Sequence, residues 1–348
     1  MNPLILSLMY FSLGLGTTMT FTASHWLLIW VGLEINTMAI TPLMIYQHHP
    51  RATEATTKYF LIQTTASALL LFAATTNAWT TGQWAITEIT NPASATLMSI
   101  ALALKIGLAP LHFWLPEVLQ GLNLITGLIL LTWQKLAPFA VLLQLYHSLN
   151  PTLLISMGLL SIIMGGWGGL NQTQLRKMLA YSSIAHIGWM IIILHYSPSL
   201  TLLNLMTYII MTSSLFLLFN TNNTTNINSI ATSYTKSPLL TIMTMTTLLS
   251  LGGLPPLTGF MPKWLILQEM TKQSLSIPAL IMAMTALLSL FFYMRLCYSI
   301  TLTLSPHPSI SSSTWRTKTL HPNSTTTLMA SLSLLLLPLT PTMLSLVT

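Results

Sequence analysis

Four charged side chains stand in long apolar stretches of the sequence. They are Glu34, Lys105, Lys135 and Lys263. A charge at the centre of a membrane helix costs roughly 2.5–3.5 kcal/mol, so such residues face a bundle interior, pair with one another or line water. Lysine differs from arginine because a lysine removed from water can lose its proton. One carboxylate with three lysines therefore indicates a proton relay, in which the charge of a nearby Glu decides whether a Lys keeps its proton.

Two histidines are weaker candidates for the same relay. His112 and His186 both lie in apolar stretches, where a lone His is more often a hydrogen-bonded core residue. No His pair has the spacing of metal ligands within such a stretch. The single cysteine, Cys297, excludes an iron–sulfur cluster or a cysteine zinc site in this chain. We therefore expect neither a metal nor a bound cofactor in this chain.

The composition explains why a charge in these stretches is informative. The chain has 348 residues, of which twelve are Lys or Arg and five are acidic, so charged residues make up 5%. An ordinary soluble domain has about 25%. The mean hydropathy is +0.70, and the net charge of +7 is scattered without a basic stripe. These values exclude a soluble enzyme, a nucleic-acid-binding module and a disordered chain, and they predict a multi-pass membrane protein.

Polar and Pro/Gly-rich segments divide the chain into candidate spans of about 20 residues, the length that crosses a bilayer as a helix. The segments of alternating polarity expected of a membrane barrel are absent from the sequence. The sequence thus predicts an all-α polytopic protein with eleven transmembrane helices, over residues 3–21, 25–45, 57–79, 95–118, 122–146, 150–170, 174–196, 198–220, 237–271, 276–303 and 325–346.

Two of these spans are interrupted by Gly and Pro. The fourth contains Gly107 and Pro110, and the ninth contains Gly252-Gly253 with Pro255-Pro256. Broken helices at matching positions of two halves predict inverted repeats. We expect one membrane domain, 1–348, made of a first five-helix repeat (1–146), a second (150–303) and an extra C-terminal helix (325–346). The alternative is that Pro and Gly are simply common in membrane helices.

The basic residues between spans predict the orientation. One set of alternate loops or loop edges carries Arg51, Lys58, Arg176, Lys177, Lys236, Arg316 and Lys318, whereas the other set carries Lys272. Positive residues stay on the side of synthesis. The N-terminus is therefore expected inside and the C-terminus outside.

Three motifs resemble those of a known family. They are Gly107-Leu-Ala-Pro-Leu-His-Phe-Trp-Leu-Pro-Glu117, Asn171-Gln-Thr-Gln-Leu-Arg-Lys-Met-Leu-Ala-Tyr-Ser-Ser-Ile-Ala-His186 and Leu251-Gly-Gly-Leu-Pro-Pro-Leu-Thr-Gly-Phe-Met-Pro-Lys-Trp264. In this order they resemble the antiporter-like, proton-translocating subunits of respiratory NADH:ubiquinone oxidoreductase, complex I. The resemblance covers nearly the whole chain, and the segment Glu117-Val-Leu-Gln-Gly121 is typical of one member.

The resemblance implies a function for the residues singled out above. Glu34 corresponds to the carboxylate that modulates Lys105 in the first broken helix, Lys135 to the central relay residue, and Lys263 to the lysine of the second broken helix. Flavin, iron–sulfur clusters, NADH and ubiquinone are bound by other subunits in this family. The implied partners are the other complex I subunits, above all neighbouring antiporter-like ones, and membrane lipids. The implied location is the mitochondrial inner membrane, with the N-terminus in the matrix and the C-terminus in the intermembrane space.

Two other hypotheses of function agree with the same sequence. A subunit of a stand-alone cation/proton antiporter shares the same motifs, although the eleven-helix length and the segment 117–121 argue against it. The chain could also be a scaffold whose buried charges hold helices together as structural ion pairs, or whose lysines extend to the membrane interface. Only a test of the buried lysines separates a scaffold from a relay.

Overall fold

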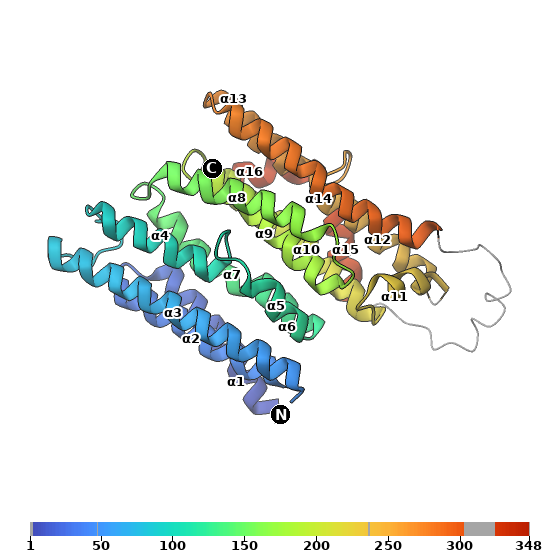
Figure 1. Cartoon of the computed structure of the whole chain (residues 1–348), viewed down its shortest axis with the longest axis horizontal. Helices are drawn as coiled ribbons and strands as arrows, with labels where there is room; N and C mark the ends of the chain where they lie inside the picture. The colour runs from blue at the N-terminus through green and yellow to red at the C-terminus, as the bar shows by residue number, and fades with distance from the viewer. Residues whose placement is uncertain (1–2, 47, 236, 303–323, 348) are drawn as a thin grey trace. The chain divides into compact units, whose positions relative to one another are not determined.

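The computed structural model describes residues 3–46, 48–235, 237–302 and 324–347, which form helices joined by short connections (Figure 1). The chain divides into two compact units, Met1–Ser161 and Ile162–Thr348. No β-strand occurs in the described ranges. Their extended pairing consists of two isolated antiparallel bridges, His25 with Ala85 and Gln174 with Asn226.

In the first unit, α3 and α7 each pack against several other helices. α3 packs against α2, α4 and α5, while α1 packs against α2, and α7 contacts α1, α2 and α4. Most residues of these helices are uncharged, so the helices pack against one another largely without ion pairs. The helices are α1 (Pro3–Thr22), α2 (Trp26–Ile45), α3 (Pro50–Thr81), α4 (Pro92–Ile106), α5 (Trp114–Gly121), α6 (Leu124–Leu131) and α7 (Trp133–Leu145).

Small residues allow α1 and α2 to approach closely. A Cβ atom added at Gly16 would lie 2.8 Å from the Gly32 carbonyl oxygen, and one added at Gly32 would lie 3.0 Å from the Gly16 carbonyl oxygen. Without side chains at this crossing, the two backbones come into contact, as is common between membrane helices. The crossing fixes α2, which carries Glu34, against α1.

The second unit is built around α9 and α10. Nearly all of α9 is buried, and α10 packs against α9, α12 and α15, while α14 packs against α12 and α13. The remaining elements of the chain are α8 (Pro151–Gly169, which contains the division between the units), α9 (Leu175–Leu194), α10 (Pro198–Thr221), α11 (Ile227–Ala231), η1 (Thr232–Thr235), α12 (Pro238–Gly252), α13 (Phe260–Lys272), α14 (Ser276–Leu302), α15 (Ser324–Leu335), η3 (Leu337–Leu339) and α16 (Thr340–Val347).

By length and composition, eight helices among the described residues could cross a membrane, or nine if the bent pair at the C-terminus is one span. The shorter apolar helices α4 and α12 fall in the two spans predicted to be broken. The prediction of an all-helical membrane protein is therefore confirmed, whereas the count of eleven depends on how the interrupted helices cross. Of the basic residues used to predict orientation, Lys236, Arg316 and Lys318 lie outside the described residues.

Both interruptions have the same local form. α4 and α12 each have 15 residues, and each ends at a glycine in the left-handed region, Gly107 with φ 85° and Gly253 with φ 81°. Glycine occupies such positions without the steric cost of a Cβ. Residues 107–113 and 253–259 then run without helix before α5 and α13 begin.

The C-terminal segment differs from the single helix predicted over 325–346. α15 ends at Leu335, and the helical segment Leu337–Ser345 that follows is bent by 66° relative to α15. Pro338 and Pro341 lie at this bend. Proline lacks a backbone N–H and clashes with the preceding turn, so two prolines three residues apart end a straight helix.

The α1–α2 crossing can be tested with two glycines of the same helix. Gly16→Ala places a methyl group against Gly32 and should destabilise the protein by about 1–3 kcal/mol, the usual cost of overpacking. Gly14→Ala is the control, because nothing lies within 4 Å of a Cβ added there. Thermal unfolding of the detergent-solubilised protein measures both. Equal melting temperatures for the two variants would contradict a close crossing at Gly16.

Candidate functional site

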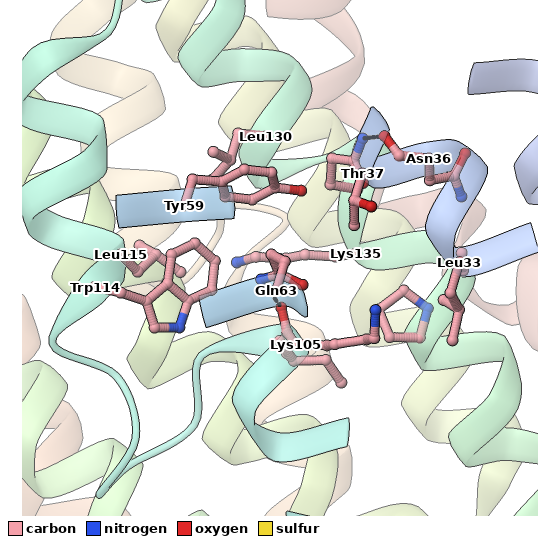
Figure 2. Close-up of a pocket in the computed structure, with 14 residues that line it drawn as sticks. Leu33, Asn36, Thr37, Tyr59, Gln63, Lys105, Trp114, Leu115, Leu130 and Lys135 are labelled. Atoms are coloured by element: carbon pink, nitrogen blue, oxygen red, sulfur yellow. Dashed lines mark hydrogen bonds between the residues drawn. The ribbon is translucent and has the colours of Figure 1, made fainter. Parts of the chain in front are cut away.

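The first unit contains a buried polar cavity into which two of the predicted relay residues project. Lys105 is 6% exposed and Lys135 is 7% exposed, and both line it. The space open to the centre of a water molecule is about 20 Å³, which is room for about one water. Figure 2 shows the two lysines together with Gln63, Tyr59 and Trp114. The complete lining is Leu33, Asn36, Thr37, Tyr59, Gln63, Lys105, Ile106, Trp114, Leu115, Leu130, Gln134, Lys135, Ala137 and Pro138.

Lys105 stands in the last turn of α4, directly before the break. Its Nζ is buried and has no hydrogen-bond partner among the described residues. Burying an amine without a partner is unfavourable. The polar cavity beside it is the place where a water molecule could serve as that partner. The Lys105 ammonium group is therefore buried beside a cavity that has room for a water molecule.

Neutral side chains satisfy the carbonyl groups that the break leaves free at the end of α4. Gln63 Nε2 donates to the Lys105 carbonyl at 3.3 Å, and Trp114 Nε1 donates to the Leu104 carbonyl at 3.2 Å. A helix end within a membrane requires such donors because lipid supplies none. These residues leave the Lys105 ammonium unengaged. Neither residue was predicted from the sequence, although Gln63 is detectable there as an amide in a charge-free span.

Lys135 lies in the first turn of α7, just after the irregular residue Thr132 that separates α6 from α7. Pro138 follows within the same helix and removes the donor that would bond to the Gln134 carbonyl. The Gln134 side chain donates to the Asn36 carbonyl at 3.0 Å, which ties α7 to α2. The helix that carries Lys135 is therefore irregular on both sides of it and fixed to α2 at the cavity wall.

Glu34 does not line the cavity. It is half-buried and borders an apolar groove on α1 and α2, together with Met9, Trp30 and Met38. No ion pair within 4.0 Å joins it to Lys105 in the described part of the chain, although the two charges interact electrostatically. Its carboxylate Oε2 accepts a hydrogen bond from Thr37 Oγ1 at 3.1 Å. Glu34 therefore lies outside the cavity, without an ion pair to Lys105 among the described residues.

Lys263 belongs to the second unit, and its ammonium is engaged by the second break. Nζ donates to the Gly252 carbonyl at 2.8 Å and to the Leu251 carbonyl at 3.2 Å, which are the last carbonyls of α12. A cation at a helix C-terminus satisfies free carbonyls and interacts favourably with the helix dipole. Gly253 makes room for it, since a Cβ there would lie 3.0 Å from Nζ.

The two histidine candidates occupy different units. His112 lies within the first break, is 1% exposed, and packs against Phe113 with ring centroids 4.3 Å apart. Its Nδ1 has no hydrogen-bond partner among the described residues. His186 lies in α9, is 6% exposed, and packs against Tyr208 with centroids 5.6 Å apart. Neither lines the cavity.

In the first turn of α5 an ion-pair cluster links the second half of the broken helix to α3. Lys58 Nζ lies 2.8 Å from both Glu54 Oε1 and Glu117 Oε2. Exposed pairs of this kind contribute about 0–1 kcal/mol each. Gly121 adds a close contact, because a Cβ there would lie 2.8 Å from Ala55 Cβ. Among the residues that the structure describes, no group of three or more His, Cys, Asp or Glu could hold a metal ion.

Comparison with known proteins agrees with this fold. The family model described as "NADH:quinone oxidoreductase/Mrp antiporter, TM" matches residues 23–289. A second model, "NADH dehydrogenase subunit 2 C-terminus", matches residues 290–344. The fold and the buried lysines thus define an antiporter-like membrane protein.

Individual relatives identify the family within this class. "NADH-ubiquinone oxidoreductase chain 2" of Squalus acanthias is 72% identical over 98% of this chain and 98% of its own length. A chain of respiratory complex I from Thermus thermophilus has a TM-score of 0.82 at 27% identity, over 96% of this chain and 79% of that one. A chain of the Mrp complex from Dietzia sp. DQ12-45-1b has a TM-score of 0.81 at 15% identity, over 95% and 74%. The chain belongs to the family of NADH-ubiquinone oxidoreductase chain 2, which is subunit 2 of complex I.

The contact of Lys263 with the end of α12 and with Gly253 can be tested with two glycines that share a left-handed conformation. Gly253→Ala should cost about 1–2 kcal/mol of backbone strain and about 1–3 kcal/mol more because its methyl group displaces Lys263 from the α12 carbonyls. Gly82→Ala carries the same strain at φ 74° with nothing within 4 Å. Thermal unfolding of the solubilised protein compares the two. An equal loss of stability in both variants would mean that Lys263 does not fill this space.

Proposed function

We propose that this chain is a membrane subunit of respiratory complex I that moves protons through a relay of buried Glu and Lys residues. The observation that carries the proposal is the cavity of the first unit, where Lys105 and Lys135 lie 6% and 7% exposed. Two buried lysines at a polar cavity are energetically costly, so their presence indicates a function that requires them. The names of the relatives support the assignment to this complex.

In the proposed relay, the Glu34 charge sets whether Lys105 holds its proton. Lys105 exchanges that proton with Lys135 through the cavity, because both side chains line it. Lys263 serves the same purpose in the second unit. His112 and His186 are secondary candidates, since both are buried near interrupted or polar parts of the bundle. Movement of protons is coupled to electron transfer from NADH to ubiquinone, which takes place in other subunits.

We also propose that the chain consists of two inverted five-helix repeats, 1–146 and 150–303, followed by an additional helical segment over 325–346, with eleven spans in all. Matching hydrogen bonds support this. The Trp26 N–H donates to the Trp84 carbonyl and the Ile86 N–H to the Ser24 carbonyl; likewise, Leu175 donates to Thr225 and Ile227 to Thr173. Each pair links the start of a second helix to the loop after the third. The matching ends of α4 and α12 agree with the same repeat.

The basic residues support an orientation with the N-terminus in the matrix and the C-terminus in the intermembrane space. The first part of α3 carries Arg51 and Lys58, and the start of α9 carries Arg176 and Lys177, all on one predicted side of the membrane. Lys272, at the end of α13, lies on the other predicted side. The proposed location is the mitochondrial inner membrane, which the names of the relatives support. The partners are other complex I subunits, above all antiporter-like neighbours, and lipids. Flavin, iron–sulfur clusters, NADH and ubiquinone belong to those other subunits, so this chain carries no redox site.

A second function, a subunit of a stand-alone cation/proton antiporter, is favoured by one observation, the similarity of fold to the Mrp complex. That similarity concerns the fold alone at 15% identity. Migration in a native gel separates the two functions. A large assembly that contains flavoprotein supports complex I, and a small assembly without it supports the antiporter.

Lys135→Met tests the relay. Methionine keeps the length of the side chain but cannot carry a proton, and one acid–base group contributes about 10²–10⁴-fold to a proton transfer. We expect proton translocation and NADH oxidation to fall at least about tenfold per assembled complex, because blocked proton movement also holds back electron transfer. Lys272→Met is the control, since Lys272 is 60% exposed and pairs with Glu269. If assembled complex that carries Lys135→Met pumps protons normally, the relay is ruled out and the chain is a scaffold.

A further inference from the structure

Glu34 and the cavity face different sides of α2, and one side chain touches both. Glu34 borders the apolar groove with Trp30 and Met38, whereas Lys105 lines the cavity. Thr37 lines the cavity as well, and its Oγ1 lies 3.1 Å from Glu34 Oε2. In a helix, residues three apart are neighbours on the surface. The Thr37 hydroxyl is therefore located between the carboxylate and the cavity.

The Thr37 hydroxyl has two acceptors within reach and a single proton to give. Besides the carboxylate Oε2 at 3.1 Å, the Glu34 backbone carbonyl lies 2.9 Å from Oγ1. A hydrogen bond to an ionised carboxylate is the stronger of the two types. The hydroxyl proton is thus directed to the side chain when Glu34 is ionised, and it can turn to the carbonyl when Glu34 is protonated. The oxygen keeps lone pairs to accept a hydrogen bond from the cavity side.

The cavity side of Thr37 is polar as well as enclosed. Thr37 is 3% exposed and Tyr59 is 2% exposed. Figure 2 shows the Tyr59 hydroxyl directed toward Thr37, across the space that Lys105 and Lys135 line. A water molecule that fits this space would meet hydroxyl groups and the Lys105 Nζ, which has no partner among the described residues. Such a water needs two to four polar partners, and the cavity provides them.

We propose that Thr37 carries protons between Glu34 and the lysine cavity, as a hydrogen-bond bridge that joins two otherwise separate sites. The proposal rests on the proposed relay function and adds the residue through which Glu34 and Lys105 communicate. It explains how a carboxylate outside the cavity, without an ion pair to Lys105, can still exchange a proton with it.

The transfer requires one water molecule as co-reactant. The Lys105 ammonium gives a proton to the water, and the water gives one of its own to Thr37 Oγ1, where a new O–H bond forms. The original Thr37 O–H bond breaks as its proton passes to Glu34 Oε2. Lys105 ends as a neutral amine, Glu34 as a carboxylic acid, and both water and hydroxyl are restored. The new O–H points toward the water, which is the orientation that the reverse step requires. Rotation of the hydroxyl back toward Glu34 prepares it for another forward step.

A purely structural hydroxyl is the competing explanation. Ser and Thr side chains within helices often bond to a carbonyl three or four residues back. Thr41, one turn further along α2, does so with the Met38 carbonyl at 2.9 Å and does not line the cavity. Thr37 has the same backbone bond but adds the carboxylate and the cavity. Thr41 is therefore the matched control on the same helix.

Thr37→Val tests the bridge in the assembled complex, because it keeps the shape of the side chain and removes the hydroxyl. We expect proton translocation per assembled complex to fall at least about tenfold, which is less than the roughly 10²–10⁴-fold that one acid–base group contributes to a proton transfer. Thr37→Ser should retain most of the rate. Thr41→Val should match the unchanged protein. The solvent isotope effect on NADH oxidation in D₂O should increase in Thr37→Val and stay unchanged in Thr41→Val, a difference that a structural hydroxyl would not produce.

The outcomes separate this bridge from the relay itself. Normal pumping in Thr37→Val together with loss of pumping in Lys135→Met overturns the bridge and leaves the relay intact. Normal pumping in both variants overturns both. If Thr37→Val lowers the amount of assembled complex on a native gel, Thr37→Ser and Thr37→Cys decide, because both are smaller than Thr and only Ser is a good donor. Equal rates for Ser and Cys would then rule out the bridge.

Discussion

The structure depends on one requirement: every backbone carbonyl at membrane depth needs a hydrogen-bond donor, since lipid provides none. Continuous helices meet it automatically, and the two breaks do not. At the end of α4 the donors are Gln63 and Trp114, which are neutral, and at the end of α12 the donor is the ammonium of Lys263. The choice of donor decides which lysine is engaged with the backbone and which is left to the cavity.

The same requirement explains why the cavity lies where it does. A break widens the space between helices and removes helical hydrogen bonds, so polar side chains gather beside it. Around the first break these are Gln63, Tyr59, Thr37 and the two lysines. Close crossings such as that of Gly16 with Gly32 hold the surrounding helices in place without polar groups. Rigid apolar contacts thus surround a small polar centre.

Much of the fold could be predicted from the sequence because charge-free stretches and Pro/Gly segments report directly on membrane helices. The bend at Pro338 and Pro341, within the segment predicted as one C-terminal helix, was not predicted from the sequence. The buried lysines were found because charge in an apolar stretch is costly. The placement of Glu34 outside the cavity could not be predicted, since it depends on which face of α2 packs against α1. Thr37, Gln63 and Trp114 were missed because neutral polar residues are common in these helices and only their contacts identify them.

The engagement of Lys263 with the α12 carbonyls is compatible with a place in the relay. An ammonium has three N–H donors, and two of them satisfy the carbonyls of Leu251 and Gly252. The neutral amine still has two donors. Lys263 can therefore release one proton while both carbonyls keep a partner, so the end of α12 need not rearrange when the charge leaves. Lys105 is not needed as a donor in this way, because Gln63 and Trp114 already donate hydrogen bonds to carbonyls at the end of α4. Each break thus combines satisfied backbone carbonyls with a lysine that keeps at least one N–H not bonded to the backbone.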